Sequence, residues 1–474
     1  MTRIVVVGNG MAATRFVEEL VGLGTPHEVV VVGDEPTASY NRILLSAVLE
    51  GTHSPEALLL KEPGWYADHG VDLRLGTRVL EVDRAAHEVV LVDGSRLAYD
   101  TLVLATGSIP TLPPIRGLVR MDGQLHPKVH AFRSLADCEG LIAALESRQA
   151  GPTTAPSRAV VVGGGLLGLQ VARALSVRGV ATEVVEGADH LLHHQVAEGA
   201  GRVLQRDLSK LGTQVYTGAR AVRLTDDGLR LDNGYTLDVD LVVLAAGGRP
   251  STALARRAGL MVRRGVVVDQ HLRSVTDDDI HAIGDCAEHR GRVTGFVPPA
   301  WEQAGVLARH LAGQPSSYDG SRSVARLRAT GLDVAVLGDP QHAQGDVVEI
   351  TNPIAGSHRR LVVRDGVIVA AALVGDLSRI GLITQLYDHR TVLGPHEPGE
   401  LLLPEQPDAP VTLPDDAEVC ACAGVSAGRI RGCTGLAQVR ETTRATTGCG
   451  GCTSVVHELL AETDPAREQA FSRA

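Results

Sequence analysis

The chain has 474 residues, which corresponds to roughly three domains of about 150 residues each. Hydrophobic residues make up 44% and charged residues 21% of the sequence, an ordinary globular composition that excludes a disordered or collagen-like chain. Its 45 Lys and Arg residues and 56 Asp and Glu residues give a net charge of −11. Binding to nucleic acid through phosphate neutralisation is therefore not expected.

The sequence shows no segment suited to a membrane. No apolar stretch approaches about 18 residues, and the apolar run at residues 4–7 is too short for the core of a signal peptide. None of the lysines ends a G-x-x-x-x-G-K run, so we expect no P-loop. We predict a cytoplasmic protein without a membrane partner.

The N-terminal residues are typical of a strand–helix–strand unit that binds a dinucleotide. Residues 4–7 and 29–32 are entirely apolar, as parallel strands covered on both faces require, and residues 14–23 can form a helix. Between the first strand and the helix lies the run GNGMAA at residues 8–13. Its glycines let the backbone turn sharply and approach a pyrophosphate at the helix N-terminus.

Acidic residues follow the second strand of this unit. Asp34 stands at the strand end, where it can accept hydrogen bonds from a ribose, and Glu35 is the next candidate.

The same pattern returns later in the chain. Residues 159–162 form an apolar run, GGGLLG follows at 163–168, and a helix leads to a second strand at 182–185. Two complete copies indicate two dinucleotide-binding units. Glu186 follows the last strand, and no arginine appears before Arg202. Because a 2′-phosphate favours arginine and a free ribose diol favours a carboxylate, we predict NADH rather than NADPH.

Further apolar strands run into glycine at residues 102–105, 241–246 and 280–283. The last of them leads to Gly284 and Asp285, which can present an amide and a carboxylate to a polyol chain, although a simple strand-end turn explains the pair equally well. Alternating residues at 324–375 predict a small antiparallel sheet. Six prolines at 395–414 predict a semi-rigid tether.

Four cysteines in two short-spaced pairs can hold a metal centre. Cys420 and Cys422 are separated by 26 residues from Cys449 and Cys452, and four thiolates can close around zinc or a [2Fe–2S] cluster. The C-x-C pair favours the cluster, because zinc usually uses two C-x-x-C turns. Cys433 stands between the pairs, and we interpret it as structural rather than as a ligand.

A disulfide-reducing flavoprotein would need a redox cysteine pair beside its flavin. The first 137 residues contain no cysteine, and Cys138 and Cys286 stand alone, so we interpret both as small buried residues. Electrons that reach a flavin must therefore leave by another route, which the C-terminal cysteines offer.

The chain resembles the flavin, NAD and [2Fe–2S] portion of NADH-dependent assimilatory nitrite reductase large subunits and the related electron-transfer subunits of assimilatory nitrate reductases. The resemblance runs from residue 3 to about residue 460, and its tail is similar to the bacterioferritin-associated ferredoxin type of cluster module. The stretches that carry it are residues 7–11, 34–42, 104–110, 162–169, 280–287 and 446–452.

Motifs and resemblance together predict three sets of cofactor-binding residues. FAD would be held by Gly8, Gly10, Ala13, Asp34, Glu35, Arg42, Thr106, Gly107, Gly284 and Asp285. NADH would be held by Gly163, Gly165, Gly168 and Glu186, and the [2Fe–2S] cluster by Cys420, Cys422, Cys449 and Cys452.

We predict an α/β fold with two Rossmann-like dinucleotide-binding domains for FAD and NAD, a small α+β domain and a small C-terminal [2Fe–2S] module. The predicted bounds are 1–115 with 248–312 for a discontinuous FAD-binding domain, 116–247 for the NAD-binding domain, 320–394 for the small reductase C-terminal domain, 395–414 for the proline-rich linker and 415–463 for the cluster module.

The predicted function is that of an NADH-oxidising electron-transfer flavoprotein. Electrons would pass from NADH to FAD, to the cluster and to a partner protein, either assimilatory nitrate reductase or nitrite reductase. This chemistry belongs to the cofactors, so we predict no catalytic side chain.

The chain departs from the family pattern in two ways. The gap between its cysteine pairs is several residues shorter than the family usually shows. The remaining cysteines are also too few for an iron–sulfur–sirohaem centre, so we expect no nitrite reduction by this chain alone.

Two alternatives stay open. One is the FAD/[2Fe–2S] subunit of an amino-acid or opine oxidase or of a cyanide-forming glycine dehydrogenase, which would not need a complete second nucleotide site. The other is a redox- or zinc-responsive interaction protein.

Overall fold

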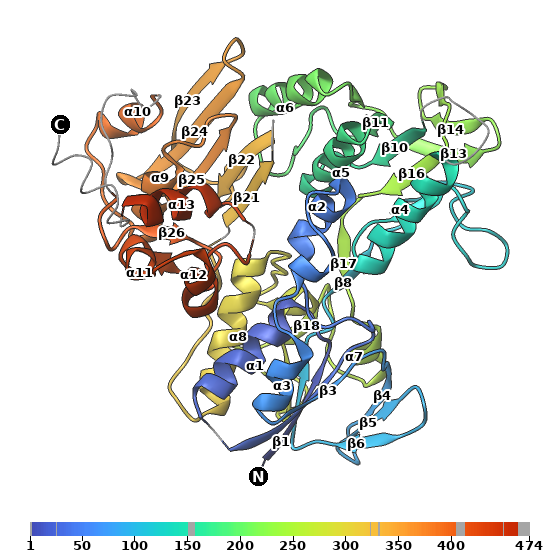
Figure 1. Cartoon of the computed structure of the whole chain (residues 1–474), viewed down its shortest axis with the longest axis vertical. Helices are drawn as coiled ribbons and strands as arrows, with labels where there is room; N and C mark the ends of the chain where they lie inside the picture. The colour runs from blue at the N-terminus through green and yellow to red at the C-terminus, as the bar shows by residue number, and fades with distance from the viewer. Residues whose placement is uncertain are drawn as a thin grey trace. The chain divides into compact units, whose positions relative to one another are not determined.

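In the computed structural model, the described part of the chain comprises residues 2–24, 26–149, 157–322, 324–329, 332–403, 413–448 and 450–462. The chain divides into two compact units (Figure 1). Unit 1 consists of Met1–Arg42, His53–Thr111 and Gly248–Ser321, and unit 2 of Ile43–Thr52, Leu112–Gly247 and Arg322–Ala474. The finer division into domains stays a prediction.

Unit 1 is built on a parallel sheet whose strand order is β19-β7-β1-β2-β3. Its strands are β1 (Thr2–Val7), β2 (His27–Val32), β3 (Val71–Arg74), β7 (Thr101–Leu104) and β19 (Ile280–Ala282). The central strands are rich in buried Val, Ile and Leu because helices or loops cover both faces of a parallel sheet. Since the strands are parallel, their carboxyl ends lie at one edge, and the first glycine loop begins there.

Helices and small antiparallel ladders complete unit 1. The helices are α1 (Met11–Gly22), α3 (Pro63–Asp68), α7 (Ala253–Arg257) and α8 (Val297–Leu311). The smaller sheets contain β4 (Val79–Asp83), β5 (Glu88–Leu91) and β6 (Arg96–Ala98), then β8 (Ser108–Pro110) with β17 (Gly248–Pro250), and β18 (Val266–Val268) with β20 (Ala287–His289). The α1 helix buries Phe16, Val17 and Leu20 in the core of the unit, the apolar spacing of an amphipathic helix.

Unit 2 contains a second parallel sheet of the same design, with the strand order β12-β11-β10-β16-β9. Its strands are β9 (Val129–Ala131), β10 (Arg158–Val162), β11 (Ala181–Val185), β12 (Gln214–Tyr216) and β16 (Leu241–Leu244). The accompanying elements are α2 (Leu45–Glu50), α4 (Leu135–Gln149), α5 (Leu166–Val177), α6 (Glu198–Lys210), β13 (Ala221–Thr225), β14 (Gly228–Leu231) and β15 (Thr236–Leu237). The internal repeat predicted from the sequence is therefore present.

A five-stranded antiparallel sheet follows in unit 2, in the order β21-β22-β25-β24-β23, as the alternation at residues 324–375 predicted. Its strands are β21 (Val324–Ala329), β22 (Leu332–Leu337), β23 (Asp346–Asn352), β24 (Ser357–Arg364) and β25 (Val367–Val374). The helix α9 (Ile380–Asp388) packs on it through Ile383 and Tyr387.

The predicted proline-rich linker is partly structured. Residues at its start form α10 (Glu397–Leu401), and Leu401 and Leu402 are buried in the core of the small sheet. Residues 404–412 lie outside the described part of the chain.

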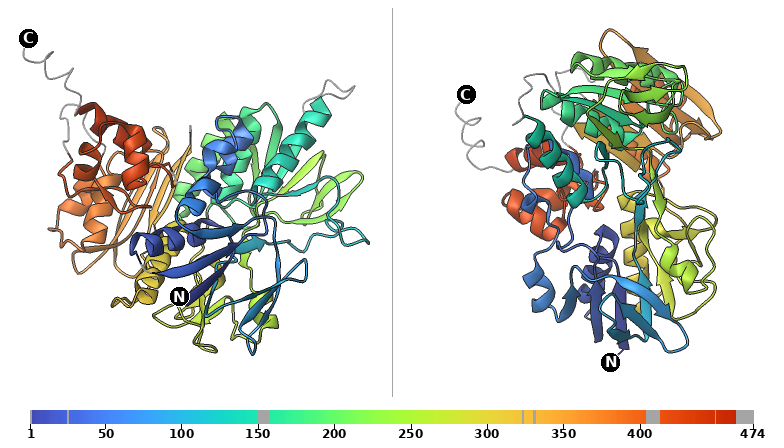
Figure 2. Two further views of the ribbon diagram at one scale, coloured as in Figure 1. Left: turned by 60° about the horizontal axis from the view of Figure 1, so that its bottom comes forward. Right: turned by 90° about the vertical axis from the view of Figure 1, so that its right-hand side faces the viewer.

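The C-terminal module has a core of its own. Its elements are β26 (Glu418–Cys420), β27 (Val425–Ser426), α11 (Ala427–Arg431), α12 (Leu436–Thr443) and α13 (Thr453–Glu462), and its helices group together in both views of Figure 2. Ile430, Val439 and Val456 are fully buried in its apolar cluster, and Cys420 and Cys452 belong to the same cluster. None of the helices in the described ranges is both long enough and apolar enough to span a bilayer.

Buried histidines lie in unit 1 next to the strand that precedes Gly284. His281 in β19 is 3% exposed, and its ring lies 6.0 Å from that of His310, which stacks on His271 at 4.6 Å. Burial, and then the neighbouring His310, lowers the pKa of His281 to about 4.

This lowered pKa predicts a loss of stability in acid. An unfolded histidine titrates near pH 6.5, whereas His281 in the folded protein stays neutral until the pH approaches 4. The contribution of His281 to the free energy of unfolding is therefore fully present above pH 6.5 and is lost as the pH falls toward 4. The contribution is about 3 kcal/mol, the free-energy equivalent of a shift of about two and a half pKa units. We expect His281→Leu to reduce the fall in the free energy of unfolding between pH 7 and pH 5, measured by urea denaturation. The exposed His457→Leu serves as control, and an equal fall in both variants would contradict the assignment.

Candidate dinucleotide and cluster sites

The first glycine loop has two glycines with different roles. Gly8 adopts φ +112°, and a Cβ there would lie 2.3 Å from the backbone oxygen of Ala105, so no other residue fits. Gly10 precedes α1, has no side-chain cap and would place a Cβ in open space. Gly8 therefore allows the turn after β1 to lie against the backbone that follows β7. Gly10 leaves the N-terminus of α1 open to an anion. Ala13, the third motif residue, is fully buried.

The acidic residues after β2 have different surroundings. The side chain of Asp34 is two-thirds exposed, and its carboxylate lies 3.6 Å from Nε of Arg78. Glu35 accepts a hydrogen bond of 2.7 Å from the Tyr40 hydroxyl and forms an ion pair with Arg42, whose guanidinium lies over the Tyr40 ring. The structure thus links the predicted residues Glu35 and Arg42 and leaves Asp34 at the surface.

The turn after β19 reaches the first turn of α1. Gly284 has φ +74°, and a Cβ there would lie 3.0 Å from the Cβ of Ala12. The amide of Gly284 donates to the side-chain oxygen of Gln303 at 2.7 Å. Because this turn packs against the glycine-loop side of α1, it brings Asp285 toward the same end of the sheet.

Asp285 is oriented by a neighbouring hydroxyl. The hydroxyl of Ser108 donates to the Asp285 carboxylate at 2.5 Å, whereas that of Thr106 donates to the backbone oxygen of Ser251 at 2.7 Å. Gly107 lies between them with φ +66°, and a Cβ there would meet no atom within 4 Å. The predicted FAD residues from three separate segments of unit 1 therefore gather at one end of its sheet.

Asn9 is a residue that the sequence reasoning missed. Val7 pairs with Val32 and Val162 with Val185, so Gly33 of unit 1 occupies the register position that Glu186 holds in unit 2. A Cβ at Gly33 would lie 2.8 Å from the Cβ of Asn9.

The side chain of Asn9 thus occupies space that a side chain at position 33 would need. Among the described residues, neither of its polar atoms has a hydrogen-bond partner, although both are buried. Buried polar atoms usually find partners, and a polar ligand in the glycine loop would supply them, so this observation fits a bound dinucleotide. Asn9 is found through the strand register, which is a property of the folded sheet.

The second glycine loop repeats the geometry of the first. Gly163 has φ +115°, and a Cβ there would lie 2.5 Å from the backbone oxygen of Ala245. Gly165 precedes α5 and would place a Cβ in open space. Gly168 would place one 1.9 Å from the backbone oxygen of Gly163, so the helix can pack on the loop only without a side chain at this position.

Glu186 lies at the end of β11 against this loop. One carboxylate oxygen accepts the amide of Gly164 at 2.7 Å, and the other accepts the amide of Ala188 at 2.8 Å. Nδ1 of His193 lies 3.8 Å from the carboxylate. Burial, and then the neighbouring His194, lowers the pKa of His193, so the imidazole is neutral near pH 7.

In the sequence no arginine follows Glu186 before Arg202, but the fold brings a later arginine close to the end of β11. Arg220 packs across Gly187, where a Cβ would lie 3.1 Å from its Cγ and 3.2 Å from its Nε. The segment is anchored there because the amide of Gly218 donates to the backbone oxygen of Ala188 at 2.7 Å. Sequence spacing could not reveal this contact, because it depends on the return of the chain after α6 and β12.

Three of the four predicted cluster ligands, Cys420, Cys422 and Cys452, lie in or against the core of the C-terminal module. Cys420 is 3% and Cys452 is 4% exposed, while Cys422 is partly exposed. The amide of Thr446 donates to the Cys452 sulfur at 3.2 Å. Such a bond favours a thiolate and tunes a metal-bound sulfur, so the donor set fits a [2Fe–2S] cluster.

The fourth predicted ligand, Cys449, lies outside the described part of the chain. Among the described residues alone, no three or more His, Cys, Asp or Glu side chains are grouped as a metal site.

The other cysteines are buried thiols bonded to backbone. Cys433 donates to the backbone oxygen of Arg429 at 3.4 Å, Cys286 to that of Leu104 at 3.3 Å, and Cys138 to that of Leu45 at 3.5 Å. Burial raises the pKa of Cys138 to about 12, and it also raises the pKa of Cys286. A thiol protonated at pH 7 is a poor nucleophile, which agrees with the structural interpretation of Cys138 and Cys286.

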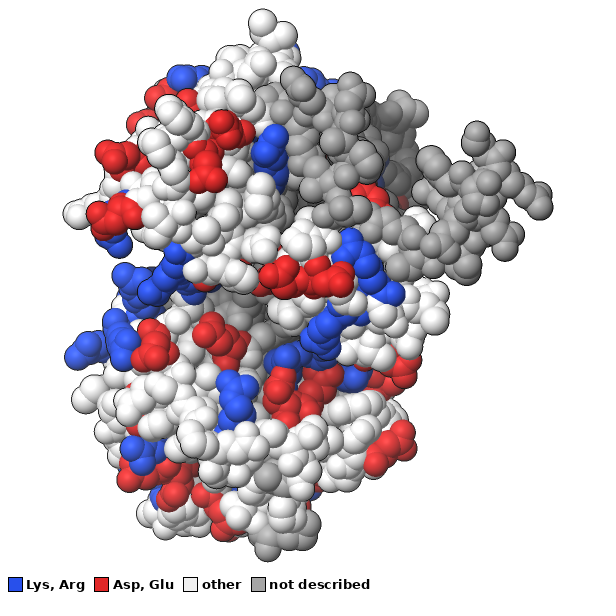
Figure 3. Space-filling view, turned by 90° about the vertical axis from the view of Figure 1, so that its left-hand side faces the viewer, with Lys and Arg blue, Asp and Glu red and all other residues white. Residues whose placement is uncertain are grey.

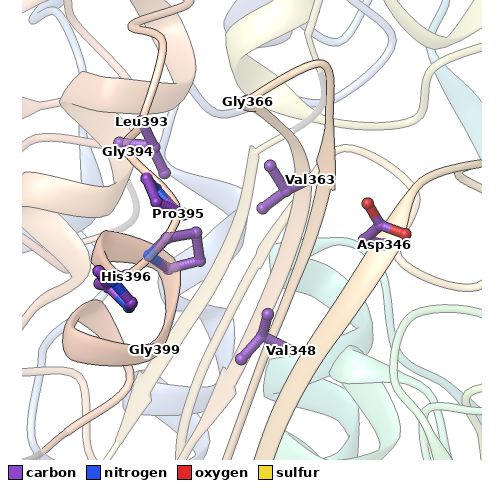
Figure 4. A pocket seen from close by; sticks show the side chains of 10 residues that line it. Asp346, Val348, Val363, Gly366, Leu393, Gly394, Pro395, His396 and Gly399 are labelled. Atoms are coloured by element: carbon purple, nitrogen blue, oxygen red, sulfur yellow. The ribbon is translucent and has the colours of Figure 1, made fainter.

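A cavity of about 490 Å³ lies on the small sheet of unit 2 (Figure 4). It is lined by Asp346 and Val348 of β23, by Val363 of β24 and by residues of the 393–399 segment, including His396. No residue predicted to bind a cofactor lines it.

Two glycine loops of this geometry define a two-dinucleotide oxidoreductase. The chain belongs to the pyridine nucleotide-disulphide oxidoreductase family, whose profile matches residues 2–304. The predicted class, an FAD-containing oxidoreductase that uses a pyridine nucleotide, is thereby confirmed.

Curated relatives confirm the predicted resemblance. The chain is 33% identical to the Bacillus subtilis "Nitrite reductase [NAD(P)H]" over 97% of its own length and 58% of that protein. It is 32% identical to the B. subtilis "Assimilatory nitrate reductase electron transfer subunit" over 97% of its own length and 59% of that protein. The chain thus spans less than three-fifths of the length of these relatives.

A solved structure confirms the fold of the reductase part. The putidaredoxin reductase–putidaredoxin complex superposes with a TM-score of 0.75 at 25% identity, covering 84% of this chain and 95% of the other.

Proposed function

We propose that the chain carries electrons from NADH through FAD and a [2Fe–2S] cluster to a partner reductase. The observation that carries the proposal is the presence, in one chain, of two glycine loops with matching geometry and a module that buries cysteines of both C-terminal pairs in one core. The names of the curated relatives support assimilatory nitrate reductase as the acceptor, with nitrite reductase as the next candidate.

When bound, FAD takes a hydride from NADH and a [2Fe–2S] cluster carries single electrons. The residues of the chain supply binding and orientation. The open N-terminus of α1 beside Gly10 would face the FAD pyrophosphate, and that of α5 beside Gly165 would face the NADH pyrophosphate. Asp285, held by Ser108, and Arg42, held by Glu35, would bind polar groups of FAD.

Gly450, which precedes Cys452 in the C-terminal module, lies beside the segment that follows Arg42. A Cβ at Gly450 would lie 3.9 Å from Cδ2 of Leu44, and both residues belong to unit 2. This contact lies within unit 2, and it is compatible with an exit route for electrons through the C-terminal cysteines. We propose a cytoplasmic location, where cysteines remain reduced and NADH is available.

Replacement of Glu186 tests the nucleotide preference. We expect the unaltered protein to prefer NADH, because a buried carboxylate accepts hydrogen bonds from a ribose diol and repels a 2′-phosphate. Glu186→Ala should lower kcat/KM for NADH about tenfold and affect NADPH less, since a hydrogen bond to a charged group contributes about 1.5–3 kcal/mol. Steady-state reduction of an artificial acceptor measures both constants, and equal constants in the unaltered protein would refute the preference.

Reconstitution with a partner tests the acceptor. The isolated chain should oxidise NADH with ferricyanide but reduce neither nitrate nor nitrite, and added molybdenum-containing nitrate reductase from the same cell should confer NADH-dependent nitrate reduction. The net charge of −11 should make this coupling weaken as ionic strength rises. On the described part of the face in Figure 3, both signs of charge are interspersed, so we expect a moderate salt dependence.

Two results would redirect the assignment. Nitrate or nitrite turnover by the chain alone would contradict the role of donor. Flavin reduction by an amine without NADH would instead favour the amino-acid or opine oxidase class.

A further inference from the structure

We infer that Arg220 gives the second dinucleotide site an anion-binding group for the 2′-phosphate, so that the site accepts NADPH as a second, weaker substrate. The inference rests on the proposed function, because it concerns the nucleotide that reduces the flavin. It names a specificity-determining residue far in sequence from the motif.

The position of Arg220 follows from the backbone around Glu186. The amide of Ala219 donates to the backbone oxygen of Glu186 at 3.2 Å, so the chain that carries Arg220 runs alongside the end of β11. The amide of Arg220 in turn donates to the Asp232 carboxylate at 3.0 Å. These bonds hold the backbone of Arg220 and direct its side chain across Gly187.

Gly187 leaves room for the arginine. Any side chain at this position would place its Cβ 3.1–3.2 Å from Cγ and Nε of Arg220, so the arginine side chain would have to shift by a few tenths of an ångström. The chain therefore has a carboxylate at Glu186 and no side chain at Gly187, and the side chain of Arg220, which is distant in sequence, packs over Gly187.

The guanidinium of Arg220 is available to a ligand. The residue is exposed, and among the described residues its side chain forms no ion pair or hydrogen bond. By contrast, both oxygens of Glu186 already accept backbone amides.

In units of this kind, the strand-end carboxylate marks the adenosine ribose, and an arginine nearby accommodates a 2′-phosphate. A guanidinium binds phosphate through charge-assisted, bidentate hydrogen bonds. Glu186 repels the 2′-phosphate of NADPH, whereas Arg220 attracts it. The site therefore prefers NADH but still accepts NADPH as a substrate.

A matched pair of ligands isolates this contact from the redox reaction. Adenosine 2′,5′-bisphosphate and 5′-AMP differ only in the 2′-phosphate, and calorimetry on the full-length, FAD-loaded protein measures their binding. We expect Arg220→Gln to weaken the binding of adenosine 2′,5′-bisphosphate about tenfold, which is the loss typical of a hydrogen bond to a charged group. The binding of 5′-AMP should weaken at most about twofold. Arg220→Lys should recover part of the loss, because lysine keeps the charge without the planar fork.

Kinetics provide the second readout. The ratio of kcat/KM for NADPH to that for NADH should fall in Arg220→Gln and stay unchanged in Arg206→Gln, an exposed arginine on α6. Equal weakening of both adenosine phosphates, or of neither, would overturn the inference. A protein whose flavin neither nucleotide reduces would refute the proposed function, whereas the calorimetric comparison would still test Arg220.

Discussion

Replacing Cys452 by serine is expected to abolish electron delivery to a protein acceptor while NADH still bleaches the flavin at an unaltered rate. Cys452 is buried in the C-terminal module and accepts the amide of Thr446, so its replacement would remove a predicted ligand of the cluster. Cys449→Ser should behave in the same way. The reason is the proposed order of the carriers, in which the cluster would take electrons from the flavin.

Stopped-flow absorbance measures flavin reduction, and EPR of the reduced protein measures the cluster. Cys433→Ser is the matched control, because this thiol lies in the same core but donates to the backbone oxygen of Arg429. The control should keep the EPR signal and the transfer of electrons. Loss of flavin bleaching in a folded, FAD-loaded Cys452→Ser protein would contradict the proposed order.

Alanine at the two glycines of the first loop is expected to give opposite results. Gly8→Ala should destabilise the protein by about 3–5 kcal/mol, because it combines left-handed strain with a backbone overlap that a side-chain movement cannot relieve. Gly10→Ala should leave the apoprotein as stable as before, because the new Cβ meets no protein atom within 4 Å. Its methyl group would instead crowd the approach of the pyrophosphate.

Urea denaturation of the apoprotein and fluorescence titration with FAD separate these effects. Gly8→Ala should lower the free energy of unfolding that urea denaturation measures. Gly10→Ala should bind FAD at least about tenfold more weakly in the titration, a loss of about 1.4 kcal/mol of binding free energy. The reverse pattern would show that the loop does not face a dinucleotide in the way proposed.

The main elements were predictable because their signals are local. The apolar runs at residues 4–7 and 29–32 are found in β1 and β2. The two GxGxx motifs lie at strand-to-helix turns, where the backbone geometry of Gly8 and Gly163 requires glycine. The first helix begins at Met11 rather than at residue 14, because Gly10 precedes its first turn without a side-chain cap to mark the start.

The proline-rich segment shows the limit of composition as a guide. Six prolines predicted a tether from residue 395, but Pro398 occupies the first turn of α10, where proline is tolerated. The side chains of Leu401 and Leu402 are buried in the core of the small sheet. A composition rule cannot detect such burial, because it depends on a surface that other strands provide.

Local patterns in the sequence were thus sufficient for the fold class, the repeated dinucleotide units, the paired cysteines and the family. Contacts between distant segments were not accessible in this way. Asn9 was identified by the register of β1 on β2, and Arg220 by the return of the chain to Gly187. The physical reason is that a motif reflects the conformation required of a single backbone turn. The residues around a ligand depend instead on which distant segments the folded sheet brings together at its edge.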